Sequence, residues 1–301
     1  MLYNPIKKGI ILAGGRGTRL YPATSVLSKL FLPIYYKPII YYPLATLMEM
    51  GIREIMIIST PLDLPRFEAL FGDGNRLGLR FRYAEQPSPE GIAQAYLIGR
   101  EFIGDDPVAL ILGDNFFSHY QAFRDYATKF KTGAVIFGRY VQNARRYGVI
   151  EMNHADQIKS LVEKPRKSES NYAMTGLYLA DARVCEIAEK LKPSKRGELE
   201  IVDVMNNYLS LDQLHVWIIT RGVDWIDAGT PSSLQTASWL VQKHEEKTGK
   251  KLACLEEIAY RRGYIDDAQV NEIIDYYIES EYGEYLFKRI SEIRKRKENE
   301  S

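Results

Sequence analysis

The chain has 301 residues, of which 46% are apolar and 26% are charged, the balance of a folded globular protein rather than a disordered one. Its net charge of +1 argues against a general polyanion binder such as a nucleic-acid coat protein, so any anion site must be local. Its two cysteines, Cys185 and Cys254, exclude a disulfide framework and are interpreted as small buried hydrophobic residues.

The N-terminal apolar run leads directly into a glycine-rich loop, and no small-residue cleavage site follows a long apolar region. We therefore interpret it as a buried strand and not as a signal peptide. No stretch approaches the roughly 18 apolar residues of a membrane-spanning helix. The expected location is cytoplasmic, with neither a membrane nor a nucleic acid as a partner.

Short apolar runs alternate with segments of helical periodicity in the first half of the chain. The predicted strands cover residues 9–12, 54–59, 79–84, 108–112 and 134–137, and the predicted helices cover 38–50, 64–71, 92–102 and 120–130. Several of these strands are apolar throughout, as is typical of a sheet with helices on both faces. The order predicts an α/β fold with a doubly wound, largely parallel, Rossmann-like sheet, in which ligands lie beyond the carboxyl ends of the strands.

The pattern changes after about residue 140. Further strands are predicted at 149–152, 158–163, 174–179 and 214–220, with helices at 182–191 and 199–209. From residue 231 the pattern is almost wholly helical, with helices predicted at 232–244, 255–261, 268–278 and 284–295. We expect a core over 1–230, with a β-rich insertion in its second half, and an accessory helical region over 231–301.

The strongest chemical signal is LAGGRGTRL at residues 12–20, directly after the first strand. Its glycines allow a tight turn whose free N–H groups form an anion-binding concavity. Arg16 and Arg19 add guanidinium groups suited to phosphate oxygens. A P-loop would need Gly-Lys followed by Ser or Thr, and a dinucleotide fingerprint starting at Gly15 would need Gly or Ala where Leu20 stands. Both of these alternatives fail.

The composite of LAGGRGTRL, YPATSVLSKLFLP and KP resembles the sugar-phosphate nucleotidyltransferases, and the resemblance continues through QPSPEG, LGDN, RYGVIE, EKP, DWIDAGT and LEEIAYR. Within that family the chain resembles members that make dTDP-glucose and pyrophosphate from dTTP and glucose 1-phosphate. That reaction begins dTDP-deoxysugar biosynthesis of the rhamnose type. The resemblance implies a nucleotide half at about 1–140, a sugar-phosphate half at about 141–230, and a homotetramer.

The resemblance assigns a nucleotide-binding set: Leu12, Ala13, Gly14, Gly15, Gly17, Thr18, Arg19, Gln86 and Gly91. The Gln86 amide offers a donor and an acceptor side by side, which complements O4 and N3–H of thymine or uracil, and Gly91 allows the base to approach the backbone. Neither group senses the 5-methyl or the missing 2′-hydroxyl. We therefore expect UTP to be a weaker but usable substrate.

Two carboxylates, Asp114 and Asp227, are expected to hold Mg²⁺ together with phosphate oxygens and water. The sugar phosphate is expected to be framed by Asn115, Tyr147, Gly148, Glu163, Lys164 and Asn171. The residues expected to act on the reacting phosphates are Arg19, Lys29, Asp114 and Lys164. Leu30 stands where the family usually has glutamine, so a polar contact from that position is lost.

The mechanism implied is positioning and electrostatic stabilisation, because a sugar phosphate is largely dianionic at neutral pH and needs no general base. Two alternatives remain open: the same chemistry with UTP or another sugar 1-phosphate, and a catalytically silent regulatory relative. The segment after LGDN, FFSHY, is one residue shorter than the family's usual loop, so altered feedback regulation is also expected.

Overall fold

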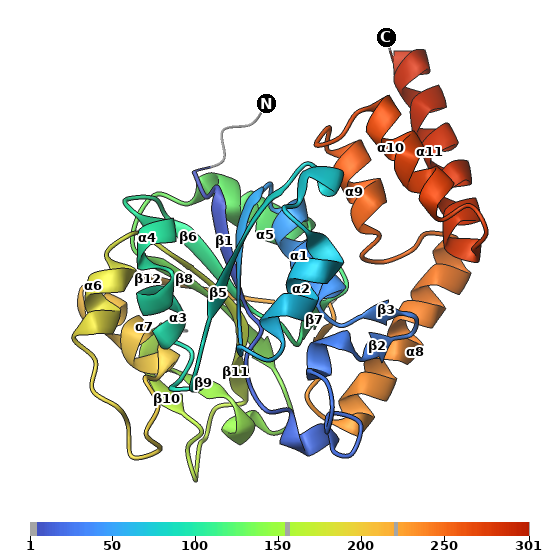
Figure 1. Ribbon diagram of the computed structural model, residues 1–301. Coiled ribbons are helices and arrows are strands. Elements are labelled where there is room, and N and C mark those ends of the chain that lie inside the picture. Colours follow the sequence, from blue (N-terminus) through green and yellow to red (C-terminus); the bar gives the residue numbers. More distant parts are fainter. Residues whose placement is uncertain (1–4, 154–156, 220–221, 301) are drawn as a thin grey trace.

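The computed structural model describes residues 5–153, 157–219 and 222–300. Its main strands are β1 (Lys8–Leu12), β4 (Glu54–Ser59), β5 (Arg80–Glu85), β6 (Val108–Leu112), β8 (Ala134–Tyr140), β9 (Gly148–Met152), β10 (Ile158–Glu163), β11 (Tyr172–Ala180) and β12 (Leu214–Ile218). Within the described residues they form a nine-stranded sheet of order β10-β9-β11-β6-β1-β4-β5, with β8 paired to β11 and β12 (Figure 1). Strands β6, β1, β4 and β5 are parallel to one another, whereas β11 runs antiparallel to β6. The largely parallel α/β fold expected from the sequence is confirmed.

Helices cover both faces of this sheet (Figure 1). One face carries α1 (Tyr41–Glu49), α2 (Leu64–Phe71) and α5 (Gln121–Lys129), and the other carries α3 (Gln94–Ile98), α4 (Arg100–Ile103), α6 (Val184–Glu189) and α7 (Ile201–Ser210). Successive residues of β1 point into opposite layers: Ile11 packs on the α1 side and Ile10 on the α3 side, both fully buried. Because neither face meets water, the strand is apolar throughout.

Two predicted helices differ from the observed ones. The helix predicted at 92–102 is divided at Gly99 into α3 and α4, where an added Cβ would lie 2.8 Å from Ile10 Cδ1. Close packing against β1 therefore requires a glycine there. The helix predicted at 38–50 begins only at Tyr41, because β2 (Pro33–Ile34) and β3 (Lys37–Pro38) form a short hairpin just before it. The strand predicted at 214–220 ends at Ile218, and Thr220 lies outside the described residues.

The C-terminal part is helical, as predicted, and comprises α8 (Pro231–Thr248), α9 (Leu255–Arg261), α10 (Asp267–Tyr276) and α11 (Glu281–Glu300). Thr230 caps α8 by accepting a hydrogen bond from Ser233 N, with Pro231 in the first turn. Helix α8 packs on the β2–β3 hairpin, and α9, which contacts α10 and α11, packs on α1 (Figure 1). Among the described residues, no helix combines the length and apolarity needed to cross a bilayer.

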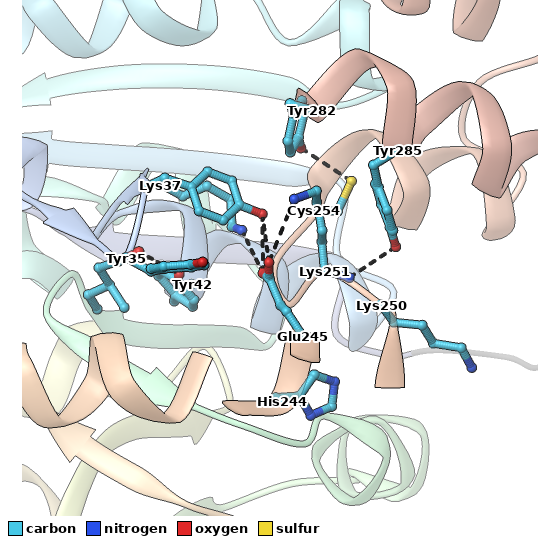
Figure 2. Close-up of polar contacts among 12 residues, drawn as sticks. Tyr35, Lys37, Tyr42, His244, Glu245, Lys250, Lys251, Cys254, Tyr282 and Tyr285 are labelled. Atoms are coloured by element: carbon cyan, nitrogen blue, oxygen red, sulfur yellow. Dashed lines mark hydrogen bonds and ion pairs between the residues drawn. The ribbon is translucent and has the colours of Figure 1, made fainter. Parts of the chain in front are cut away.

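A buried ionic cluster joins this helical region to the hairpin (Figure 2). Glu245 of α8 accepts a hydrogen bond from Lys37 Nζ at 3.2 Å and another from Tyr36 Oη at 3.1 Å, while Lys251 Nζ lies 3.7 Å from its other oxygen. The Lys37 side chain is only 3% exposed. Burial lowers the pKa of Lys37 to about 8, although Glu245 acts in the opposite direction. The hairpin directly follows the segment that carries Lys29, so ion pairs tie the helical region to that segment.

Replacing Glu245 by alanine should lower the free energy of unfolding by about 3–5 kcal/mol, because it leaves Lys37 buried without its carboxylate partner. Urea unfolding monitored by circular dichroism measures the change. Glu246→Ala is the matched control: Glu246 pairs with Lys243 at 3.4 Å on the exposed side of the same helix, and its loss should cost at most about 1 kcal/mol. Equal losses for the two variants would contradict a structural role for the buried cluster.

Candidate active site

The parallel strands β1, β4, β5 and β6 end at the same edge of the sheet. Residues that the sequence predicts to be functional follow three of these strands. Strand β1 leads into the glycine loop after Leu12, β5 leads into Gln86, and β6 leads into Asp114. The backbone connects these ends: Ala13 N donates to Ile58 O at 2.7 Å, and Gly113 N donates to Leu12 O at 2.9 Å. Residues distant in sequence are thereby gathered at the carboxyl edge of the sheet, where the fold class leads us to expect ligands.

The glycine loop adopts backbone conformations that other residues avoid. Gly15 has φ 101° and Gly17 has φ 59°, both in the positive region that favours glycine. An added Cβ at Gly14 would overlap the Gln86 Oε1 atom, so glycine there makes room for the Gln86 amide. The loop ends in a short 3₁₀ turn, Thr18–Leu20, that carries Arg19 into the site.

A small two-stranded ladder brings the two candidate metal ligands together. Strand β7 (Asn115–Phe117) pairs antiparallel with β13 (Trp225–Asp227), and Asp227 lies opposite Asn115. Asp114 directly precedes β7, so this pairing sets the two carboxylates near each other although more than 100 residues separate them in the chain.

Each of these carboxylates faces a cation. Lys29 Nζ forms an ion pair with Asp114, and Arg19 Nη1 lies 3.8 Å from Asp227 Oδ2. Burial would raise the pKa of Asp114, but the charge of Lys29 and hydrogen bonds from Lys29 and Asn115 hold that pKa below its ordinary value. Burial and the negative charge of Asp114 raise the pKa of Asp227. Lys29 and Arg19, which are expected to bind phosphate, are thus paired with the carboxylates of Asp114 and Asp227.

These residues line a cavity of about 630 Å³. It contains nine of the sequence-predicted side chains and backbone positions: Thr18, Arg19, Asp114, Asn115, Tyr147, Gly148, Glu163, Lys164 and Asp227. The chain therefore brings residues of its N-terminal half and of its second half into one compartment.

The second half forms the far wall of the cavity. The Tyr147 ring packs against Trp225 with a centroid distance of 5.1 Å, and Tyr147 O accepts a hydrogen bond from Lys164 N at 3.1 Å. Lys164 has φ 39°, an uncommon conformation for a residue with a side chain, and its Nζ lies 3.1 Å from Glu163 Oε1. An added Cβ at Gly148 would lie 3.4 Å from the Glu163 carboxylate. Backbone geometry therefore fixes the positions of this lysine and carboxylate at the cavity.

Two asparagines expected at the sugar phosphate differ in position. Asn115 lines the cavity but is 3% exposed, and its amide makes three hydrogen bonds: Oδ1 accepts from Trp225 Nε1 at 2.6 Å and from Gly176 N at 2.9 Å, and Nδ2 donates to Asp114. This arrangement supports the Asp114 carboxylate. Asn171 lines a separate hollow with Tyr140 and is not brought together with the other predicted residues.

Two further positions that the sequence analysis singled out, Gly91 and Leu30, contribute to packing. Gly91 has φ 108°, and an added Cβ would overlap the Leu199 carbonyl oxygen, so this glycine lets the loop before α7 approach. Leu30, the departure from the family's usual glutamine, is fully buried and packs against Gly113 just before Asp114.

Sequence reasoning missed two polar residues at the site. Gln94 Oε1 accepts a hydrogen bond from Gln86 Nε2 at 2.7 Å and therefore orients the Gln86 amide. Arg196 lines the cavity and lies 3.1 Å from Glu163 Oε1 and 3.3 Å from Glu200 Oε1. Gln94 lies three residues after QPSPEG, and Arg196 lies in the polar segment SKRGE at 194–198, so closeness to a motif and local charge were the signals available.

The donor set at Asp114 and Asp227 fits a magnesium ion. Two carboxylates with oxygen donors suit this hard cation, and Asp114 and Asp227 line the same cavity, with Asp227 opposite the residue that follows Asp114. Within the part of the chain that the structure describes, no three His, Cys, Asp or Glu side chains converge as a metal-binding group. The remaining ligands would therefore be substrate oxygens and water.

Comparison with known proteins agrees with this geometry. Residues 8–244 match the family described as nucleotidyl transferase. The chain is 48% identical over 284 residues to the glucose-1-phosphate thymidylyltransferase of Neisseria meningitidis, covering 93% of this chain and 98% of that protein. It is 47% identical over 283 residues to the protein of the same name from Mycobacterium tuberculosis, covering 93% and 98%.

Solved structures are also similar. A Bacillus anthracis protein described as a candidate glucose-1-phosphate thymidylyltransferase, in complex with sucrose, has a TM-score of 0.72 and 40% identity, covering 77% of this chain and 94% of that one. A UDP-glucose pyrophosphorylase complexed with UDP-glucose has a TM-score of 0.71 and 27% identity, covering 79% and 99%.

Proposed function

The chain belongs to the nucleotidyl transferase family and is a nucleotidyltransferase, and on that premise we propose that it makes dTDP-glucose and pyrophosphate from dTTP and glucose 1-phosphate. The observation that carries the proposal is the single cavity in which the Arg19 side chain, the Asp114–Asp227 pair and the Glu163–Lys164 pair meet. Relatives that share 47–48% of their residues over 93% of this chain bear the corresponding name.

In the proposed reaction, an oxygen of the sugar phosphate attacks the α-phosphorus of the nucleotide, and the bond to the leaving pyrophosphate breaks as the new bond forms. Repulsion between the two anions is the principal barrier. Arg19 and Lys29 bind oxygens of the triphosphate and offset the charge that develops on pyrophosphate. Lys164, whose Nζ lies 3.1 Å from Glu163 Oε1, binds the sugar phosphate and directs its oxygen toward the α-phosphorus.

We propose that Asp114 and Asp227 hold Mg²⁺ when the nucleotide is present. The ion would neutralise charge on the phosphates, a contribution that suits a reaction with no side-chain nucleophile. The support is the donor set itself: two neighbouring carboxylates at the carboxyl edge of the sheet, each now paired with a cation.

A pyrophosphate-release assay tests the proposal directly. With Mg²⁺ and glucose 1-phosphate, dTTP should give the highest kcat/KM, UTP a lower but measurable value and CTP little turnover, because Gln86 complements the edge shared by thymine and uracil. The sugar arm compares glucose, galactose and mannose 1-phosphates. Preference for another nucleotide or sugar would assign the same chemistry to a different product, and no turnover with any pair would indicate a catalytically silent relative.

Gln94 provides a test of base recognition. Gln94→Leu should raise KM for dTTP about 5- to 10-fold, because the Gln86 amide loses the hydrogen bond that orients it. KM for glucose 1-phosphate should stay unchanged. Gln242→Leu is the control, since Gln242 bonds Glu246 on exposed α8, far in the fold from Gln86. A rise in KM for both substrates would argue that Gln94 supports the fold and not the base site.

We also propose that the enzyme is a cytoplasmic homotetramer that supplies the first step of dTDP-deoxysugar synthesis of the rhamnose type. The resemblance to the family supports this proposal. Light scattering coupled to gel filtration measures the mass in solution, and a monomer at micromolar concentration would contradict the tetramer.

A further inference from the structure

One cationic side chain that lines the cavity forms no hydrogen bond or ion pair with the described residues. Four cationic side chains line it, and three are paired: Arg19 with Asp227, Lys164 with Glu163, and Arg196 with Glu163 and its neighbouring carboxylates. The fourth, Arg146, makes no hydrogen bond or ion pair to any residue that the structure describes. A cation that makes no ion pair with these residues, in a site for anions, is in position to pair with a ligand.

The backbone that carries Arg146 is well fixed. Arg146 ends a short 3₁₀ turn that begins at Ala144, which is 1% exposed, and Tyr147 N closes the turn by donating to Ala144 O at 2.9 Å. Tyr147 O in turn accepts the hydrogen bond from Lys164 N. Arg146 is therefore the residue before Tyr147, whose carbonyl group is hydrogen-bonded to Lys164. The side chains of Arg146 and Lys164 start from the same wall of the cavity.

The charge of Arg146 acts on two groups that line the cavity. It contributes to lowering the pKa of Asp227 and of Tyr147, against the larger raising effect of burial at both groups. Arg146 lines the same cavity as Asp227, whereas its neighbour Arg145 lines the separate hollow.

We propose that Arg146 binds the phosphate of the sugar 1-phosphate. The inference rests on the proposed function. Arg146 comes from the wall that also carries Lys164, whereas the cations nearest the glycine loop, Arg19 and Lys29, come from the nucleotide side. A guanidinium donates two parallel hydrogen bonds to a phosphate, so Arg146 fixes the orientation of the attacking group that a lysine ammonium would hold only as a point charge.

The test is steady-state kinetics of Arg146→Ala with each substrate varied in turn. KM for glucose 1-phosphate should rise about 10- to 100-fold, while KM for dTTP changes by less than about twofold. Arg146→Lys should recover part of the loss, because it restores the charge but not the paired donors. Arg145→Ala is the matched control: Arg145 is adjacent in sequence, donates to Asn143, and lines the other hollow. It should behave as the wild type.

Inhibition by inorganic phosphate gives a second readout. In wild-type protein, phosphate should compete with glucose 1-phosphate, and Arg146→Ala should weaken that inhibition by a factor similar to the rise in KM. The variant leaves no partner unpaired, so its urea midpoint should match the wild type.

The outcomes separate the two proposals. If wild-type protein makes no dTDP-glucose, the proposed function fails. If the wild type is active but Arg146→Ala leaves KM for glucose 1-phosphate unchanged, the Arg146 assignment fails alone. A rise confined to KM for pyrophosphate in the reverse reaction would also overturn it, by assigning the guanidinium to the leaving group.

Discussion

Replacing Arg19 by alanine should lower kcat with dTTP and glucose 1-phosphate by about 10²–10³-fold, equivalent to about 3–4 kcal/mol of lost transition-state stabilisation. The reason is geometric: Arg19 follows the glycine loop and lines the cavity within 3.8 Å of Asp227. Without the Arg19 guanidinium, the negative charge that develops on the leaving pyrophosphate would no longer be stabilised at this position. Initial rates of pyrophosphate release at saturating substrate measure the effect.

Arg16 provides the control within the same loop. It is exposed and is outside the set of residues that line the cavity, although the sequence pattern alone does not separate it from Arg19. Arg16→Ala should retain kcat within about threefold of the wild type. Near-normal turnover in Arg19→Ala, or an equal loss in Arg16→Ala, would contradict the role given to Arg19. Because the Arg19 side chain is 53% exposed, its removal should leave stability nearly unchanged.

Replacing Asp114 by asparagine should lower kcat by at least about 10³-fold and also destabilise the protein by about 3–5 kcal/mol. The amide keeps the shape of the side chain but removes the charge that a metal ion needs and that the Lys29 ammonium faces. Both side chains of this ion pair are at least four-fifths buried, with exposures of 16% for Lys29 and 11% for Asp114. Initial rates across a magnesium series and urea unfolding measure the two effects.

A double variant separates catalysis from stability. In Asp114→Asn with Lys29→Met, the buried ammonium is removed together with its partner, so most of the stability should return while activity stays lost. Asp106→Asn is the control, because Asp106 pairs with Lys8 at 2.8 Å, outside the cavity. Recovery of activity in the double variant would show that Asp114 acts only by neutralising Lys29.

The parallel sheet and its helices could be predicted because apolar runs and helical periods are local signals. The glycine loop could also be predicted, because glycine allows the positive φ angles that Gly15 and Gly17 adopt, and this local property does not depend on the rest of the fold. The fold class places the carboxyl ends of the parallel strands at one edge, so the sequence predicts Gln86 and Asp114 near the loop. Both lie at that edge because β1, β5 and β6 are parallel members of one sheet, and of the two only Asp114 lines the cavity.

Other features depend on pairings that no local pattern reports. The β7–β13 ladder consists of three-residue strands, too short for a period to appear, and yet it brings Asp227 to Asp114. The hairpin at 33–38 is not predicted because its two-residue strands are too short for a period to appear, and the helix predicted at 38–50 overlaps it only at Pro38. Side-chain direction was also beyond the sequence: Asn115 and Asn171 are both polar residues in matching segments, but only Asn115 lines the cavity.

The ion pair between Lys29 and Asp114 couples two kinds of ligand. A divalent ion that reaches Asp114 alone must displace the ammonium, which then stays buried with no anion to meet it. A triphosphate supplies that anion, so the displaced lysine gains a new partner at the moment the carboxylate gains the ion. If Mg²⁺ binds Asp114 as proposed, the ion and the nucleotide are heterotropic effectors of each other, and the apparent Kd for magnesium should fall as the nucleotide concentration rises.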